Sequence, residues 1–219
     1  MQEIEAKFYV QDLKQIESRI QKLDAHLIQP RVLETNIRFD LPDGGLSSER
    51  RVLRLRQDTE ARFTYKGPGM NEQGVLSRTE IEFTVSDFEK AKEFLGALGY
   101  QPIFYYEKYR TTYTLESDSL LSRTHEPAHR LQICHIMLDE MPYGNFVEIE
   151  GESIAQIRSM ANKLNLDWQA AISKSYSRLF EIARRSLGFT FSDLTFANFE
   201  KIKVAPESIQ VRPADSRHR

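Results

Sequence analysis

Charged side chains recur at every second position within several apolar or aromatic stretches of this 219-residue chain. In the opening stretch, Glu3, Glu5 and Lys7 alternate with three apolar residues. Successive residues of a β-strand point to opposite faces of a sheet, so such a stretch is charged on one face and apolar on the other. The chain must therefore form a sheet that buries its apolar face and gathers charges of both signs on the opposite face.

Eight stretches carry strand patterns separated by turn-forming sequences such as Pro42-Asp43-Gly44-Gly45. The predicted strands span about 2–9, 32–41, 51–58, 61–67, 77–85, 102–114, 130–139 and 145–151. Helical spacing of apolar residues predicts helices over about 13–23, 88–98, 153–165 and 168–187. Since a parallel sheet needs a helix at nearly every crossover, so few helices predict an α+β protein with an antiparallel sheet.

The charged face of this sheet is expected to point inward. A single pair of alternate charges would be compatible with a solvated face, but six strands share the pattern. If the helices cover the apolar face, the charged face lines the interior once the sheet closes, and a barrel of about eight strands has room for one small ligand. We therefore predict a closed eight-stranded antiparallel β-barrel, or tunnel, with helices packed on the outside.

The predicted interior holds acids and bases in nearly equal number. The acids are Glu3, Glu5, Glu80, Glu82, Asp139, Glu148 and Glu150. The bases are Lys7, Arg54, Arg56, Lys66, Lys108 and Arg110. Buried charges are costly unless they are hydrated, paired or bound to a ligand. A polar tunnel whose ligands carry both signs of charge therefore explains the pattern better than a purely structural core.

The residue types indicate which ligands these are. Clustered Arg and Lys side chains suit phosphate oxygens. Carboxylates without an accompanying set of His and Cys suit Mg²⁺ or Mn²⁺ better than zinc. The sequence contains no GxxxxGK[ST] motif and so predicts no P-loop. The expected ligands are therefore a polyphosphate and a divalent cation.

An ordered set of motifs resembles the CYTH superfamily, the triphosphate tunnel metalloenzymes, and is most similar to the bacterial branch of class IV adenylate cyclase-like proteins and tripolyphosphatases. The likeness covers about residues 1–187. Its motifs are Glu3-Ile4-Glu5-Ala6-Lys7, Leu53-Arg54-Leu55-Arg56, Thr64-Tyr65-Lys66-Gly67-Pro68, Arg78-Thr79-Glu80-Ile81-Glu82, Glu107-Lys108-Tyr109-Arg110, Leu138-Asp139-Glu140, Gly144-Asn145-Phe146-Val147-Glu148-Ile149-Glu150-Gly151 and Ser173-Lys174-Ser175-Tyr176.

This resemblance implies a role for each matching residue. The residues expected to bind the triphosphate are Lys7, Arg54, Arg56, Lys66, Lys108 and Arg110, with Arg38 as an added contact. Those expected to hold metal, directly or through water, are Glu3, Glu5, Asp139, Glu148 and Glu150, with Glu80 and Glu82 as further candidates. Glu5, Glu150 and Lys7 are the expected catalytic residues, and either carboxylate could position the attacking water. Lys174 either reaches a tunnel mouth or solvates a helix.

Hydrolysis of inorganic tripolyphosphate or of an organic triphosphate is the leading hypothesis. The alternative is cyclisation of ATP to cyclic AMP and pyrophosphate by a class IV adenylate cyclase. Thiamine triphosphatase activity and a non-catalytic polyphosphate-binding module are further alternatives. The bases alternate with acids at a net charge of -2, which predicts no nucleic-acid partner.

Other features bear on location and assembly. The sequence shows neither a secretory signal nor an apolar run long enough to span a membrane, and its lone Cys134 suits a reducing compartment. A cytoplasmic protein without a membrane partner is therefore expected, and a homodimer is compatible with the sequence. The motifs assign residues 1–187 to the tunnel domain. Residues 188–219 are expected to form an appendage, whose aromatic part could instead plug one barrel mouth, followed from Val204 by a poorly ordered tail.

Overall fold

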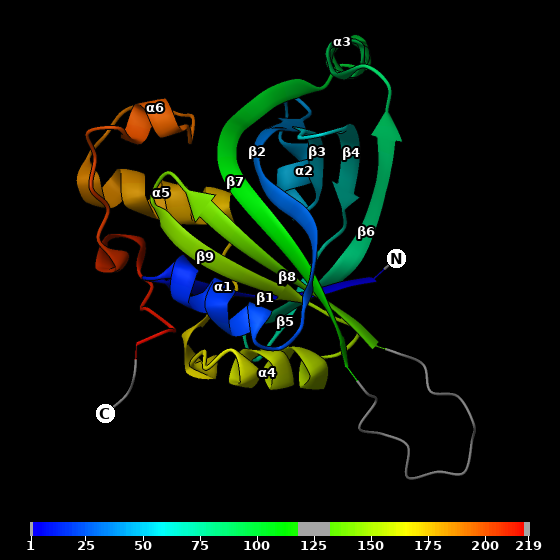
Figure 1. Cartoon of the computed structure of the whole chain (residues 1–219). Coiled ribbons are helices and arrows are strands. Elements are labelled where there is room, and N and C mark those ends of the chain that lie inside the picture. The colour runs from blue at the N-terminus through cyan, green and yellow to red at the C-terminus, as the bar shows by residue number, and fades with distance from the viewer. Residues whose placement is uncertain (1, 118–131, 217–219) are drawn as a thin grey trace, which may run out of the picture.

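The two ends of the sheet meet and hydrogen-bond to each other in the computed structural model, which describes residues 2–117 and 132–216 (Figure 1). Its strands are β1 (Gln2–Val10), β2 (His26–Asp40), β3 (Val52–Gln57), β4 (Ala61–Lys66), β5 (Met70–Glu72), β6 (Val75–Val85), β7 (Gln101–Ser117), β8 (Gln132–Met141), β9 (Gly144–Glu150) and β10 (Ala171–Ile172). In the described part of the chain, eight strands pair in the order β1-β9-β8-β7-β2-β3-β4-β6, and β6 pairs with β1.

All pairings between these strands are antiparallel, and the eight-stranded ring carries β10 and β5 as short additions beside β1 and β6. The predicted antiparallel sheet is thus confirmed. Its strands are not spaced evenly around an axis, so the barrel is irregular in section. The first two residues of the strand predicted over 130–139 lie outside the described residues.

The helices are α1 (Leu13–Gln21), α2 (Gly45–Ser48), α3 (Phe88–Ala97), α4 (Ile154–Lys163), α5 (Tyr176–Leu187) and α6 (Phe196–Phe199), with 3₁₀ turns η1 (Trp168–Ala170) and η2 (Pro206–Ile209). The side chain of Asp12 caps α1, and Ile16 and Ile20, four residues apart, bury one face of it. Ser175 caps α5, which ends at Gly188, where φ is 73° and the left-handed backbone favours glycine.

The helices cover the outer, apolar face of the ring. α1 and α4 pack on β1, β8 and β9, where Phe8 and Ile149 are fully buried, and Figure 1 shows both helices beside these strands. α3 packs on β2 and β3 through Leu95 and Leu55. Because the apolar residues point outward into this cover, the alternate charged residues of the same strands point inward.

An aromatic cluster fills the end of the ring nearest α5. Tyr9 and Phe146 lie on the inner face of β1 and β9 and contact each other edge to face, with ring centroids 5.4 Å apart. Phe180 of α5 and Phe199 of α6 belong to the same buried cluster. The aromatic part of the C-terminal segment therefore packs with α5 at this end of the barrel.

Two local predictions differ from the structure. The helix predicted over 168–187 is wrong for its first eight residues, because β10 pairs with β1, with Ile172 opposite Lys7, and only α5 is a regular helix. The segment after Val204, expected to be poorly ordered, instead forms η2 and buries Ile209 and Ala214. The N–H of Ala214 donates to the carbonyl oxygen of Tyr9 (2.8 Å). No helix among the described residues is long and apolar enough to cross a membrane.

Candidate functional site

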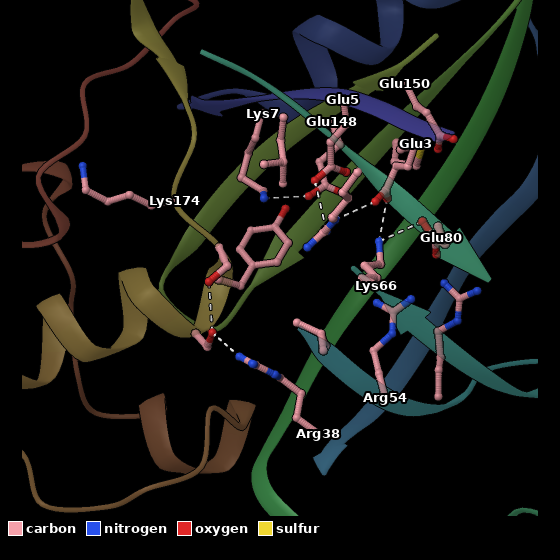
Figure 2. A pocket seen from close by; sticks show the side chains of 18 of the residues that line it. Glu3, Glu5, Lys7, Arg38, Arg54, Lys66, Glu80, Glu148, Glu150 and Lys174 are labelled. Atoms are coloured by element: carbon pink, nitrogen blue, oxygen red, sulfur yellow. Dashed lines mark hydrogen bonds and ion pairs between the residues drawn. The ribbon is translucent and has the colours of Figure 1, made fainter. Parts of the chain in front are cut away.

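A cavity of about 610 Å³ lies inside the ring and is lined by side chains from β1, β2, β3, β4, β6, β7, β8 and β9 and from the start of α5 (Figure 2). Every site residue predicted from the sequence lines it except Asp139. Those residues are Glu3, Glu5, Lys7, Arg38, Arg54, Arg56, Lys66, Glu80, Glu82, Lys108, Arg110, Glu148 and Glu150. The alternation of charged residues therefore does converge on one interior space.

One side of the cavity is an acidic wall, formed by Glu3 and Glu5 of β1, Glu80 of β6, and Glu148 and Glu150 of β9. Glu5 and Glu150 are direct cross-strand neighbours. Burial raises the pKa of Glu5, and Glu148 and Glu3 raise it further. Burial and the charges of Glu3, Glu5 and Glu80 raise the pKa of Glu150 to about 7. Arg78 Nη2 lies 3.7 Å from Glu5 Oε1, yet the pKa values of both facing carboxylates stay raised, so the nearby cations do not offset burial and the repulsion between acids.

The other carboxylates of the wall, Glu3, Glu80 and Glu148, pair with four cations, Lys7, Lys66, Arg78 and Arg110. Lys7 Nζ lies 2.9 Å from an oxygen of Glu148. Lys66 Nζ lies 2.5 Å from Glu3 Oε1, and Arg78 Nε lies 2.9 Å from Glu3 Oε2. Burial alone would raise the pKa of Glu148, but Lys7, then Arg110 and Lys108, hold it well below its ordinary value. The wall thus combines closely paired carboxylates with Glu5 and Glu150, whose pKa values stay raised despite the nearby cations.

The opposite side is a basic wall, formed by Arg38 of β2 with Arg54 and Arg56 of β3; Figure 2 shows Arg38 and Arg54 apart from Glu5, Glu148 and Glu150. Arg38 and Arg54 are cross-strand neighbours. Burial lowers the pKa of Arg38 and of Arg56, and the charge of Arg54 lowers both further. The buried Nε atoms of these three arginines have no hydrogen-bond partner among the described residues. Glu82 pairs with Arg54 and Arg56 through their other nitrogens, so each guanidinium group keeps one buried donor that could bind an anion.

Asp139 lies behind this cavity and does not line it. It is fully buried and accepts two hydrogen bonds from Arg110 (both 2.6 Å), one from Lys108 (3.1 Å) and one from the hydroxyl of Tyr176 (2.7 Å). The position predicted to hold metal therefore orients two cations of the cavity. Glu82, a further metal candidate from the sequence, lines the cavity and pairs with Arg54 and Arg56.

Sequence reasoning missed several residues of the site. Glu34 is buried, and Lys108, Arg110 and Arg56 outweigh its burial and lower its pKa to about 2. Arg78 pairs with Glu3. Both obey the same alternation, two residues before Asn36 and Glu80, and that signal could have identified them. Lys174 lines the edge of the cavity, and Figure 2 shows it apart from the carboxylates.

The acidic wall fits a divalent cation by its chemistry. Among residues 2–117 and 132–216, no three Asp, Glu, His or Cys side chains already surround a common point as a metal site. The donors of the wall are nevertheless all carboxylate oxygens, which Mg²⁺ and Mn²⁺ prefer. A cation beside Glu5 and Glu150 would relieve the repulsion that raises their pKa values.

Solved structures from diverse organisms share this fold. A proposed adenylate cyclase from Vibrio parahaemolyticus superposes with a TM-score of 0.65 at 17% identity, covering 82% of this chain and 97% of its own. The PH1012 protein of Pyrococcus horikoshii superposes with a TM-score of 0.59 at 24% identity, covering 80% of this chain and 96% of its own. A proposed adenylyl cyclase from Hippeastrum, with a dominant triphosphatase activity, superposes with a TM-score of 0.56 at 17% identity, covering 96% of this chain and 100% of its own.

The sequence comparisons give two results. A search of curated proteins finds no match. The model of the CYTH domain family matches residues 1–175. This match spans all the strands that form the ring and every residue of the two walls. The chain therefore belongs to the CYTH domain family.

Proposed function

We propose that this protein is a hydrolase that cleaves a triphosphate with the help of Mg²⁺ or Mn²⁺. One observation carries the proposal: an acidic wall, in which the pKa values of Glu5 and Glu150 are raised, faces a basic wall whose three arginines each keep a buried Nε without a hydrogen-bond partner among the described residues. A metal–triphosphate complex carries positive charge on one side and negative charge on the other. It would therefore neutralise both walls at once.

The acidic wall would hold the metal through Glu5 and Glu150, with Glu3, Glu80 and Glu148 as nearby carboxylates. A bound divalent cation would neutralise charge on the transferred phosphoryl group and on the leaving group. Lys66 and Arg78, already paired with Glu3, keep that part of the wall from excess negative charge.

The basic wall would orient the substrate. Arg54 and Arg56 present guanidinium groups that suit phosphate oxygens, and Arg38 is held toward the same space by the hydroxyl of Ser177, 2.7 Å from its Nη1. Lys7 lies between Glu148 and the face of the Tyr176 ring, 4.2 Å from the ring centroid. From there it would stabilise negative charge that develops during phosphoryl transfer.

Proton transfer from the attacking water requires a base on the acidic wall. Glu150 suits this role because it lies opposite Glu5, beside the proposed metal, where it would accept a hydrogen bond from the attacking water. It also has no ion-pair partner among the described residues. Glu5, its cross-strand neighbour, would help to position the water.

Adenylate cyclisation is the alternative for the same cavity, and thiamine triphosphate is another substrate to test. The cyclase reaction needs the same groups and, in addition, a site for adenine and a ribose hydroxyl aligned on the α-phosphorus. Hydrolysis needs only water, so we place it first.

Product analysis distinguishes these reactions. The purified protein is incubated with Mg²⁺ or Mn²⁺ and, in turn, tripolyphosphate, ATP or thiamine triphosphate, and the products are resolved by ion-exchange chromatography. Orthophosphate that depends on the metal is the expected product. Cyclic AMP with pyrophosphate would establish the cyclase instead, and tight binding without any product would leave a polyphosphate-binding module.

A further inference from the structure

Tyr106 brings a neutral hydrogen-bond donor into the cavity, and no role described above uses it. It lies on the inner face of β7, opposite Asn36 of β2, and lines the cavity although it is only 7% exposed. Arg54 Nη1 donates to its phenol oxygen at 3.4 Å. Among the described residues, no group accepts the hydrogen of this phenol. A buried hydroxyl that accepts but does not donate indicates a missing acceptor.

Aromatic packing holds the ring of Tyr106 in place. It stacks on Phe104 with centroids 5.5 Å apart and an interplanar angle of 22°. Phe104 in turn contacts Phe180 of α5, at 5.4 Å between centroids. Rotation of the phenol away from Arg54 would disturb this packing, so its hydroxyl is held toward the cavity.

The backbone at Tyr106 is held by the C-terminal segment as well as by β2. The pairing of β7 with β8 begins only at Tyr109, so this stretch has no partner from β8. Leu194 takes that place as an isolated parallel bridge. Its N–H donates to the carbonyl of Tyr105 (3.0 Å), and its carbonyl accepts from the N–H of Glu107 (2.9 Å). Leu194 lies beyond residue 175, where the family match ends, so this support comes from the chain's own C-terminal segment.

The charges around the phenol favour an anionic acceptor. The groups that face it are Arg54 of β3, Lys108 of β7, Glu34 and Arg38 of β2, and Tyr143 between β8 and β9. Burial raises the pKa of Tyr106, but Arg54 and Lys108 lower it more, so the pKa lies below its ordinary value. Positive groups predominate, which favours a phosphate oxygen as the missing acceptor.

We propose that Tyr106 is a substrate-binding residue whose phenol donates a hydrogen bond to a phosphate oxygen held by Arg54. This inference rests on the proposed function, because it needs a phosphate in the cavity. Phosphate binding should therefore depend on the protonation state of Tyr106, because the neutral phenol donates to phosphate, whereas the phenolate repels it.

The first test compares Tyr106→Phe, which keeps the ring, with Tyr105→Phe as a matched control. Tyr105 is the adjacent residue, and its hydroxyl lies 3.2 Å from Glu107 rather than in the cavity. For Mg²⁺-dependent tripolyphosphate hydrolysis, kcat/KM should fall about 10-fold in Tyr106→Phe and stay unchanged in Tyr105→Phe. The alkaline fall of the wild-type pH profile should disappear in Tyr106→Phe. A role limited to packing would leave this limb in place.

The second test does not need turnover. The wild-type protein is titrated to alkaline pH with and without tripolyphosphate, and phenolate formation is followed by near-ultraviolet absorbance. Tripolyphosphate should move the ionisation of one tyrosine phenol to higher pH in the wild type, and this change should be missing in Tyr106→Phe. Equal affinity, turnover and pH profile in both proteins would overturn the inference and leave the proposed function intact. A wild type that neither binds nor cleaves any triphosphate would overturn both.

Discussion

Glu5 and Glu150 lie directly opposite each other on β1 and β9, inside the barrel. Like charges in this position repel, and both carboxyl groups have raised pKa values. A chain selected for stability alone would place an opposite charge or an apolar residue at one of these positions. The pair instead concentrates negative charge that a divalent cation would relieve, and the proposed function depends on this relationship.

Neutralising one member of the pair should stabilise the metal-free protein and stop the reaction. In Glu5→Gln, the unfolding temperature of the metal-free protein at about pH 8 should rise by about 1–4 °C, because one repulsion is lost. Metal-dependent turnover should fall at least about 100-fold. Calorimetry and a phosphate-release assay measure the two effects.

The matched control for that variant is Glu140→Gln. Glu140 lies on β8 and pairs with Arg31 outside the cavity. Its substitution should leave turnover unchanged. Normal activity in Glu5→Gln would contradict the role of the pair.

Stabilisation by a divalent cation should depend on pH. The pKa of Glu150 is about 7 in the folded protein and near its ordinary value of 4.5 in the unfolded chain. Between these values the unfolded chain ionises first, so the metal-free fold loses stability as pH rises. A cation binds the ionised pair and removes this penalty. The increase in unfolding temperature caused by Mg²⁺ should therefore be larger at about pH 8 than at about pH 5, and a reversed or flat dependence would argue against a site at Glu150.

The basic wall should require arginine rather than any cation. In Arg54→Lys, the affinity for tripolyphosphate should fall about 10-fold, because an ammonium group cannot contact phosphate and Thr64 through a planar fork. Isothermal titration calorimetry measures this change. Arg62→Lys is the control, since Arg62 binds Asp58 (2.8 Å) and does not line the cavity. An equal loss in both variants would point to general electrostatics instead.

The C-terminal segment should contribute to the stability of the barrel. Leu194 is fully buried, so Leu194→Ala should lower the free energy of unfolding by about 2–5 kcal/mol. Leu187→Ala, at a position that is 38% exposed, should lower the free energy of unfolding by about 1 kcal/mol or less. Urea unfolding of both variants tests this. Equal small losses would mean that the segment is not part of the cooperative fold.

Much of the fold could be predicted because the alternation of charge is itself a strand signal. It located the eight strands of the ring and the face on which the site lies. It could not locate β10, because two residues such as Ala171 and Ile172 carry no periodicity and pair only once β1 offers its edge. The sequence also did not predict that the segment after Val204 is ordered. Most of its residues are polar, and tertiary packing buries only a few of them, among them Ile209 and Ala214.

The site was predicted less completely than the fold, for a related reason. Charge type alone cannot tell a residue that lines the cavity from one behind it. Asp139 and Glu148 are both acids predicted to lie on the inner face of a strand. Glu148 lines the cavity, whereas Asp139 is enclosed by Arg110, Lys108 and Tyr176. Tyr176 comes from α5, and this long-range contact could not be read from strand spacing.

If the proposed function is right, both walls bind one metal–triphosphate complex. A crystal structure with Mn²⁺ and a non-hydrolysable triphosphate analogue, in which anomalous scattering locates the metal, would show this complex. We expect an anomalous peak beside the carboxylates of Glu5 and Glu150, with phosphate oxygens against Arg54 and Arg56. Manganese bound elsewhere, or the analogue bound on the outer surface of the barrel, would contradict it.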